Sequence, residues 1–261
     1  MIHRRLIAKG IKYYLTLPHN TGHGIHSPFL FRLINEVFSK DIDYDVFRKI
    51  ENYRQQLIWS NEKLLVSELG ARSSSRSGYK KIKNIAQKES TPHHYGRLLY
   101  NLAREFEPEN MLELGTCLGI GTLYLALGNP SGKVFSIEGS AEKASLASSM
   151  LQKEAPNTEI FIGNFDEQLP KVLQAAGKID LAFIDGNHKK ESTLKYFNDI
   201  LEYSHDNTVF VFDDINWSPG MMEAWHEIQN YPKTRVCLDL FRMGIVLLSP
   251  KLQKENFTIF Y

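Results

Sequence analysis

Residues 111–122 read MLELGTCLGIGT, a short apolar run followed by three glycines and the beginning of a second apolar run. The first run predicts a buried strand, and the glycines predict a tight turn that opens a helix and brings backbone N–H groups close to a ligand. Gly115, Gly119 and Gly121 lack the G-x-G-x-x-G spacing that suits a pyrophosphate, and no GKS or GKT phosphate loop occurs in the chain. The turn therefore predicts a ligand other than a pyrophosphate.

Around this turn, from residue 91 onward, short apolar or β-branched runs alternate with helical patterns. Such alternation is typical of βαβ units, so we predict an α/β fold with a mostly parallel, seven-stranded sheet. The predicted strands are Asn110–Leu114, Lys133–Ile137, Glu159–Ile162, Leu181–Ile184, Thr208–Phe212, Arg235–Leu238 and Gly244–Leu248. The predicted helices are Gly119–Leu127, Ala141–Lys153, Gln168–Ala175, Lys189–Tyr203 and Pro219–Asn230.

The first 90 residues differ from the rest of the chain in charge. They hold 16 Lys and Arg against 8 Asp and Glu, whereas residues 91–261 hold 15 against 22. Helical patterns at residues 2–17, 28–38 and 44–59 predict that residues 1–90 form a helical cap or substrate module on a domain of residues 91–261. Candidates to face a substrate in this module are His23, His26, Arg72 and Ser73. The whole chain carries a formal net charge of +1, which argues against general binding to polyanions.

The glycine turn is followed, at the end of the next predicted strand, by a carboxylate at Glu138. With its E-x-G-x-x-x-G pattern the sequence resembles the class I S-adenosylmethionine-dependent methyltransferases, especially the catechol and caffeoyl-CoA O-methyltransferases. The resemblance spans residues 91–248 and implies a doubly wound, Rossmann-like sheet. It implies that Glu138 binds the ribose of S-adenosylmethionine. The other cofactor-binding residues that it implies are Glu113, Gly115, Thr116, Gly119, Asn164, Phe165 and Asp185.

Three aspartates directly follow two predicted buried strands: Asp185 after one, Asp213 and Asp214 after the other. If these strands are neighbours, the carboxylates meet at one edge of the sheet, where they could hold a hard cation such as Mg²⁺. The resemblance implies the same three residues as metal ligands and His188 as the catalytic base, together with Asp185. The Asp-Gly-x-His form at 185–188 also resembles macrocin-type sugar O-methyltransferases. Alternatives stay open: Asp213 or Asp214 could cap a helix, Asp185 could bind substrate without metal, and His188 could merely begin a helix.

The resemblance implies an enzyme that methylates a hydroxyl of a small molecule with the help of a divalent metal. Two alternatives are methylation of RNA or protein through the basic N-terminal module, and a non-catalytic interaction protein with the same fold. We expect a cytoplasmic protein with no membrane span and no nucleic-acid partner, and a homodimer is compatible with the sequence.

Overall fold

The computed structural model of the chain describes residues 27–66, 78–259 and 261. The chain divides into two compact units, one of residues 37–179 and one of residues 1–36 with 180–261. This division does not coincide with the predicted boundary at residue 90. That boundary separates a cap or substrate module from the rest of the chain, and it stays a prediction. The predicted helix at 2–17 and the candidates His23, His26, Arg72 and Ser73 lie outside the described residues.

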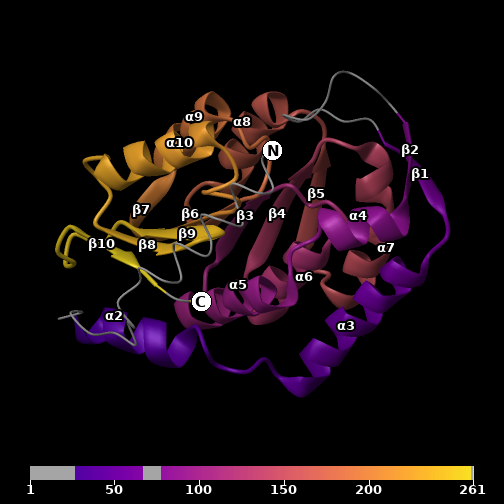
Figure 1. Cartoon of the computed structure of the whole chain (residues 1–261), viewed down its shortest axis with the longest axis horizontal. Helices are drawn as coiled ribbons and strands as arrows, with labels where there is room; N and C mark the ends of the chain where they lie inside the picture. The colour runs from indigo at the N-terminus through magenta and orange to yellow at the C-terminus, as the bar shows by residue number, and fades with distance from the viewer. Residues whose placement is uncertain (1–26, 67–77, 260) are drawn as a thin grey trace. The chain divides into compact units, whose positions relative to one another are not determined.

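The unit of residues 37–179 is built on three parallel strands in the order β3-β4-β5 (Figure 1). A separate antiparallel hairpin, β1 with β2, places Leu65 opposite Tyr79. The strands are β1 (Lys63–Val66), β2 (Gly78–Lys81), β3 (Asn110–Leu114), β4 (Lys133–Glu138) and β5 (Thr158–Ile162). The helices are α3 (Tyr44–Trp59), α4 (Ile82–Lys88), α5 (His93–Phe106), α6 (Ile120–Gly128), α7 (Ala141–Glu154) and α8 (Phe165–Ala176).

Nearly all residues of strands β3 and β4 are buried, and their apolar residues follow one another in Met111-Leu112 and Val134-Phe135. A strand covered by helices on both faces has no solvent side, so it shows a continuous apolar run rather than an alternating pattern. Helix α6 is equally buried, and only Leu127 within it is partly exposed. The glycine turn between β3 and α6 therefore stands on two rigid, buried elements.

The unit that contains residues 180–261 has its strands in the order β10-β8-β9-β7-β6. Strand β9 runs antiparallel to both β7 and β8, and β10 runs parallel to β8. The strands are β6 (Ile179–Ile184), β7 (Ser204–Phe212), β8 (Val236–Leu240), β9 (Met243–Leu247) and β10 (Glu255–Thr258). The helical segments are α2 (Pro28–Arg32), the π-helical turn η1 (Leu33–Val37), α9 (Lys190–Leu201) and α10 (Pro219–Asn230).

The predicted fold class is confirmed, since β3 to β10 belong to one mostly parallel sheet with helices between its strands. The sheet has eight strands rather than the predicted seven. The additional strand, β10, is only four residues long and alternates between half-buried and exposed positions, which gives it no apolar run. Tyr196 and Phe197 of α9 are buried and belong to the core.

Among the residues that the structure describes, none of the helices combines the length and the apolar character needed to cross a bilayer.

Candidate active site

The glycine turn has the backbone shape that its sequence predicts. Gly115 has a φ of 109°, and its N–H donates a hydrogen bond to the carbonyl oxygen of Ile137 at 2.9 Å. Gly119, with a φ of 81°, is the N-cap of α6. A Cβ on Gly119 would lie 3.1 Å from the Cβ of Ala147 on α7. Glycine is therefore required at 119 both for the left-handed backbone and for the close approach of α7.

Glu113 is fully buried beneath this turn. Its Oε2 accepts hydrogen bonds from Thr122 Oγ1 at 2.5 Å and from Ser136 Oγ at 2.6 Å, and Ser136 Oγ also lies 2.5 Å from Thr116 Oγ1. Burial raises the pKa of Glu113 to about 7, although these hydrogen bonds oppose the rise. Through Ser136, Glu113 and Thr116 thus connect the glycine turn to β4. Their predicted contact with a cofactor stays a prediction.

The pKa of Glu113 predicts a pH-dependent stability. A carboxyl group whose pKa is raised on folding stabilises the fold fully below its unfolded pKa, and this contribution is lost as the pH rises through about 7. We therefore expect Glu113→Gln to gain stability relative to the wild type between pH 5 and 8, by up to about 3 kcal/mol. Urea unfolding of the ligand-free proteins at each pH measures the difference. Glu159→Gln, which changes a half-exposed glutamate on β5, is the control, and parallel curves for wild type and Glu113→Gln would contradict the prediction.

Glu138 ends β4 with its carboxylate held by two backbone donors. Cys117 N–H donates to Oε2 at 2.7 Å, and Ser140 N–H donates to Oε1 at 2.8 Å. Burial raises the pKa of Glu138, while the charge of Lys143 opposes the rise. Each oxygen keeps a further lone pair, so the oriented carboxylate can accept hydrogen bonds from a pair of neighbouring hydroxyls.

The end of β5 lies beside Glu138. Gly163 N–H donates to the carbonyl oxygen of Glu138 at 2.9 Å, and Asn164 accepts a hydrogen bond from Asp166 N–H at 3.0 Å as the N-cap of α8. Phe165 is the first residue of that helix and is half-buried. The structure thus brings 163–165 to the same edge as Glu138, and the adenine contact of Asn164 and Phe165 stays a prediction. The donors and acceptors along this edge fit a nucleoside such as that of S-adenosylmethionine.

Sequence reasoning missed one anchor of the glycine turn. Tyr53, on α3, donates a hydrogen bond from its hydroxyl to the carbonyl oxygen of Leu118 at 2.9 Å, and it is buried. Burial raises the pKa of this hydroxyl, so it stays a donor. A single tyrosine on an amphipathic helix gives no sequence signal of a contact 65 residues away.

In the other unit, the predicted meeting of the aspartates takes place. Strands β6 and β7 are neighbours, and Asp213 N–H donates to the carbonyl oxygen of Ile184 at 3.0 Å. Burial and the Asp213 charge raise the pKa of Asp185 well above its usual range. The capping of α10, left open for Asp213 and Asp214, is done by Ser218, which accepts from Met221 N–H at 3.2 Å.

Arg242 is a second residue that sequence reasoning missed. It lies in the turn between β8 and β9 and forms a bidentate pair with Asp213, from Nε to Oδ1 at 2.8 Å and from Nη2 to Oδ2 at 2.6 Å. Its Nε also lies 3.7 Å from Oδ1 of Asp214. The side chain of Asp213 has no exposed surface, whereas 30% of the Arg242 side chain is exposed. Arg242 therefore supplies a positive charge beside Asp213 and Asp214.

This arrangement does not fit the predicted magnesium site. Both oxygens of Asp213 bond to the guanidinium, and within residues 27–66 and 78–259 no set of three acidic, His or Cys side chains is arranged to hold a metal. A divalent ion about 4 Å from a guanidinium would be repelled by about 8 kcal/mol at an effective dielectric constant of about 20. The ligand set Asp185, Asp213 and Asp214 is thus in conflict with Arg242.

His188 lies near the carboxyl groups of Asp185 and Asp214. Its Nε2 is 3.8 Å from Oδ1 of Asp185 and 3.8 Å from Oδ2 of Asp214. These distances allow electrostatic attraction but exceed those of hydrogen bonds. The turn that carries His188 is fixed by Asn187, whose Nδ2 donates to Ser192 Oγ at 2.9 Å and to the Tyr196 hydroxyl at 3.1 Å. The imidazole is partly exposed and can accept a proton from a bound molecule.

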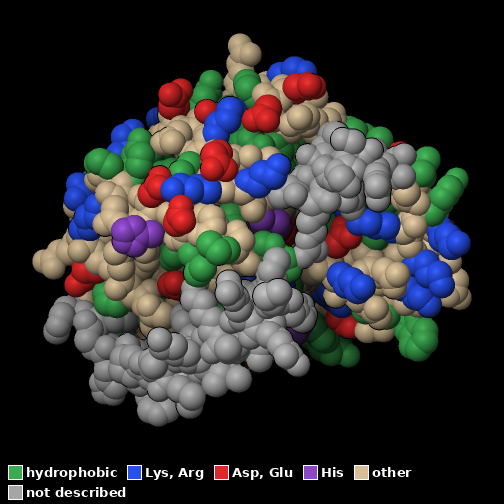
Figure 2. Space-filling view, turned by 45° about the horizontal axis from the view of Figure 1, so that its top comes forward, with side chains coloured by type: hydrophobic (Ala, Val, Ile, Leu, Met, Phe, Trp, Pro, Cys, Tyr) green, Lys and Arg blue, Asp and Glu red, His purple; other side chains and the backbone are tan. Residues whose placement is uncertain are grey.

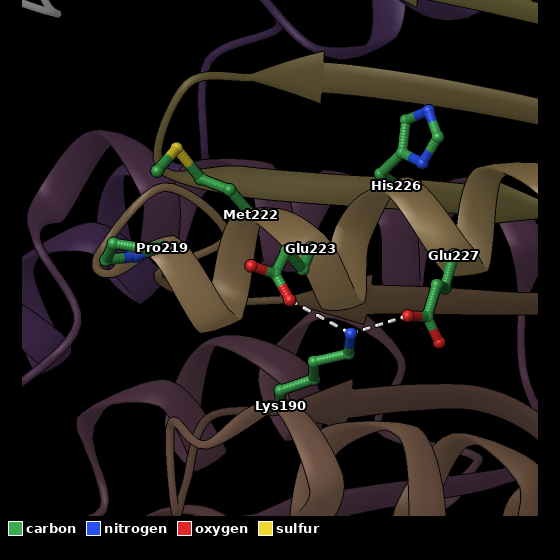
Figure 3. Close-up of a pocket in the computed structure, with 6 residues that line it drawn as sticks. All are labelled: Lys190, Pro219, Met222, Glu223, His226 and Glu227. Atoms are coloured by element: carbon green, nitrogen blue, oxygen red, sulfur yellow. Dashed lines mark hydrogen bonds and ion pairs between the residues drawn. The ribbon is translucent and has the colours of Figure 1, made fainter.

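A surface pocket of about 370 Å³ lies between α9 and α10 (Figure 3). Lys190 spans it, with Nζ 3.0 Å from Glu223 Oε2 and 2.7 Å from Glu227 Oε1. Met221 and Trp225 of α10 are buried, as expected for core packing of this helix, whereas Met222, for which core packing was also expected, lines the pocket. None of the residues predicted for catalysis lines this pocket.

The sheet and the glycine turn give the chain an α/β fold, and comparison with known proteins shows what it is similar to. A model described as a methyltransferase domain matches residues 112–215. Catechol O-methyltransferase of Mycobacterium tuberculosis is 31% identical over 130 residues, which cover 49% of this chain and 57% of that protein. Catechol O-methyltransferase of Niastella koreensis is 25% identical over 174 residues, 65% of this chain and 74% of that protein.

A solved structure shows the same fold. The O-methyltransferase from Bacillus cereus in complex with SAH superposes with a TM-score of 0.57 at 19% identity, over 80% of this chain and 93% of that one. In sequence and fold the chain is similar to the class I S-adenosylmethionine-dependent methyltransferases, of the catechol and caffeoyl-CoA O-methyltransferase type. It spans just over half the length of the M. tuberculosis relative.

Proposed function

We propose that the protein transfers the methyl group of S-adenosylmethionine to a hydroxyl of a small molecule. In this displacement the bond between sulfur and the methyl carbon breaks, a bond between oxygen and that carbon forms, and S-adenosylhomocysteine leaves. The hydroxyl proton passes to Nε2 of His188. The observation that carries the proposal is the carboxylate of Glu138, oriented at the end of β4 by N–H groups of the glycine turn and the following helix start.

His188 is the proposed base because of where it lies. It is partly exposed and lies 3.8 Å from both Asp185 and Asp214, and the carboxylate of Asp214 stabilises the imidazolium formed when the proton arrives. Asp185 and Asp214 are therefore proposed to orient His188, which keeps the predicted pairing of Asp185 with His188 in catalysis. Since both oxygens of Asp213 are bonded to Arg242, no step of this mechanism passes through magnesium.

The names of the relatives support a small aromatic diol as the first substrate to test. Incubation with S-adenosylmethionine and catechol, followed by a panel of sugars and phenols, should release S-adenosylhomocysteine in step with one methylated product. Absence of turnover with every hydroxyl compound, together with absence of cofactor binding, would contradict the proposal.

The alternative, methylation of RNA or protein, would need a basic surface, and part of the basic N-terminal module lies outside the described residues. In Figure 2 acidic and basic side chains of described residues lie intermingled in the upper centre of the view. Intermingled charges give little attraction to a polyanion, so a small molecule remains the proposed substrate.

Replacing Glu138 with alanine should weaken binding of S-adenosylhomocysteine at least about tenfold. Charge-assisted hydrogen bonds to the ribose are worth on the order of 1.5–3 kcal/mol, and the variant also loses the acceptor that orients Cys117 N–H. Isothermal titration calorimetry measures the affinity. Glu159→Ala, on the neighbouring strand, is the matched control and should bind like the wild type; equal affinity in Glu138→Ala would remove the ribose role.

A further inference from the structure

The turn that carries Arg242 is tied to the loop after β7 by the backbone as well as by the ion pair. Ile215 N–H donates to the carbonyl oxygen of Arg242 at 3.0 Å, and Asn216 Nδ2 donates to that of Phe241 at 2.7 Å. Asp239 Oδ1 accepts from Phe241 N–H at 2.8 Å and closes the turn itself. These bonds fix the backbone of the turn that carries Arg242, and the ion pair fixes its guanidinium at Asp213.

The position of Arg242 suits a fixed charge. A guanidinium is planar, permanently charged and matched to both oxygens of a carboxylate, whereas magnesium requires octahedral oxygen ligands. Asp213 offers both oxygens to the guanidinium from a site with no exposed side-chain surface, and Asp214 lies on the same side at 3.7 Å. The geometry is that of a completed ion pair beside a second carboxylate.

We propose that Arg242 is the permanent cation of this site, a positioning residue that holds Asp213 and Asp214 where the family resemblance implies a divalent metal, so that methyl transfer needs no metal. Through Asp214 it sets the place of His188, whose Nε2 lies 3.8 Å from that carboxylate. The reaction in this statement rests on the proposed function, but the replacement of the metal does not, because metal binding is measured without substrate or cofactor.

The first test uses the wild-type protein after treatment with EDTA and gel filtration. Titration with Mn²⁺, followed by the electron paramagnetic resonance signal of the free ion, should show no binding with a dissociation constant below about 1 mM. Turnover should be the same in excess EDTA and in added Mg²⁺. One tightly bound Mn²⁺ per chain that is lost in Asp213→Asn would overturn the proposal.

The second test removes the guanidinium. Arg242→Ala leaves three aspartates without their cation, so Mn²⁺ should now bind and raise its melting temperature by at least about 5 °C at saturation. Arg242→Lys retains a positive charge and should show no such rise; Arg235→Ala, at the start of β8, is the matched control and should also show none. A melting temperature of Arg242→Ala that Mn²⁺ leaves unchanged would contradict the replacement of a metal by this residue.

The outcomes separate the two proposals. Failure of the wild type to bind S-adenosylhomocysteine would refute the proposed function and leave the Mn²⁺ results standing. If Arg242→Ala does not fold, the wild-type titration and the EDTA assay still decide. A purely structural role of Arg242 would predict lower stability in Arg242→Ala with no gain of Mn²⁺ binding.

Discussion

Replacing His188 with alanine is expected to lower kcat by about 10²–10⁴-fold, the usual contribution of a positioned general base. An alcohol or phenol attacks a methyl carbon poorly while it keeps its proton, and His188 is the partly exposed imidazole that lies 3.8 Å from both Asp185 and Asp214. The side chain does not contact Glu138 or the glycine turn in any described hydrogen bond, so affinity for S-adenosylhomocysteine should change less than twofold. Steady-state kinetics and calorimetry measure the two quantities.

The control for this experiment is His226→Ala, which removes a histidine from the pocket between α9 and α10. Its kcat should equal that of the wild type within experimental error. If kcat of His188→Ala stays within threefold of the wild type at every pH, His188 is not the base. A fall in cofactor affinity that accounts for the whole loss would equally exclude that role.

The second large effect concerns stability. Arg242→Ala should lower the free energy of unfolding by about 3–5 kcal/mol, because it leaves the carboxylate of Asp213 buried without its partner. Asp213→Ala should lower the free energy of unfolding less, because the side chain of Arg242, which then lacks its partner, is 30% exposed and can turn toward water. Urea unfolding of both variants and of the double variant gives the coupling energy. Equal costs for the two single variants would contradict the difference in burial on which this prediction depends.

Much of the fold could be predicted because buried parallel strands leave a direct trace in the sequence. The runs at 110–114, 133–137 and 208–212 are rich in apolar residues since both of their faces are covered, and each recurs in a strand of the sheet. Helix α3 has the bounds that its pattern predicts, Tyr44–Trp59. The hairpin of β1 and β2 was not predicted, because four-residue strands with exposed polar positions resemble a loop.

The positions of candidate residues could be predicted where these residues follow the ends of strands. They could not be predicted where a residue takes its place through a long-range ion pair. Asp185, Asp213 and Glu138 follow buried runs, so a parallel sheet places them at its edges without further information. Arg242 lies 29 residues after Asp213 in a turn between two strands, and nothing in its neighbours signals a buried acid as partner. Three aspartates without Arg242 resemble a metal site. Magnesium was therefore predicted because the sequence does not reveal the ion pair of Asp213 with Arg242.

The division of the chain into two units bears on how the protein emerges from the ribosome. Residues 37–179 are contiguous, so the core around β3, β4 and β5 and the carboxylate of Glu138 can assemble once that stretch has been made. The other unit joins α2 to strands of residues 180–261, which are synthesised after it. Closing such a long loop costs chain entropy and waits until those strands have been made. The edge of the sheet that carries Glu138 is thus an earlier product of synthesis than the pair of Asp213 with Arg242.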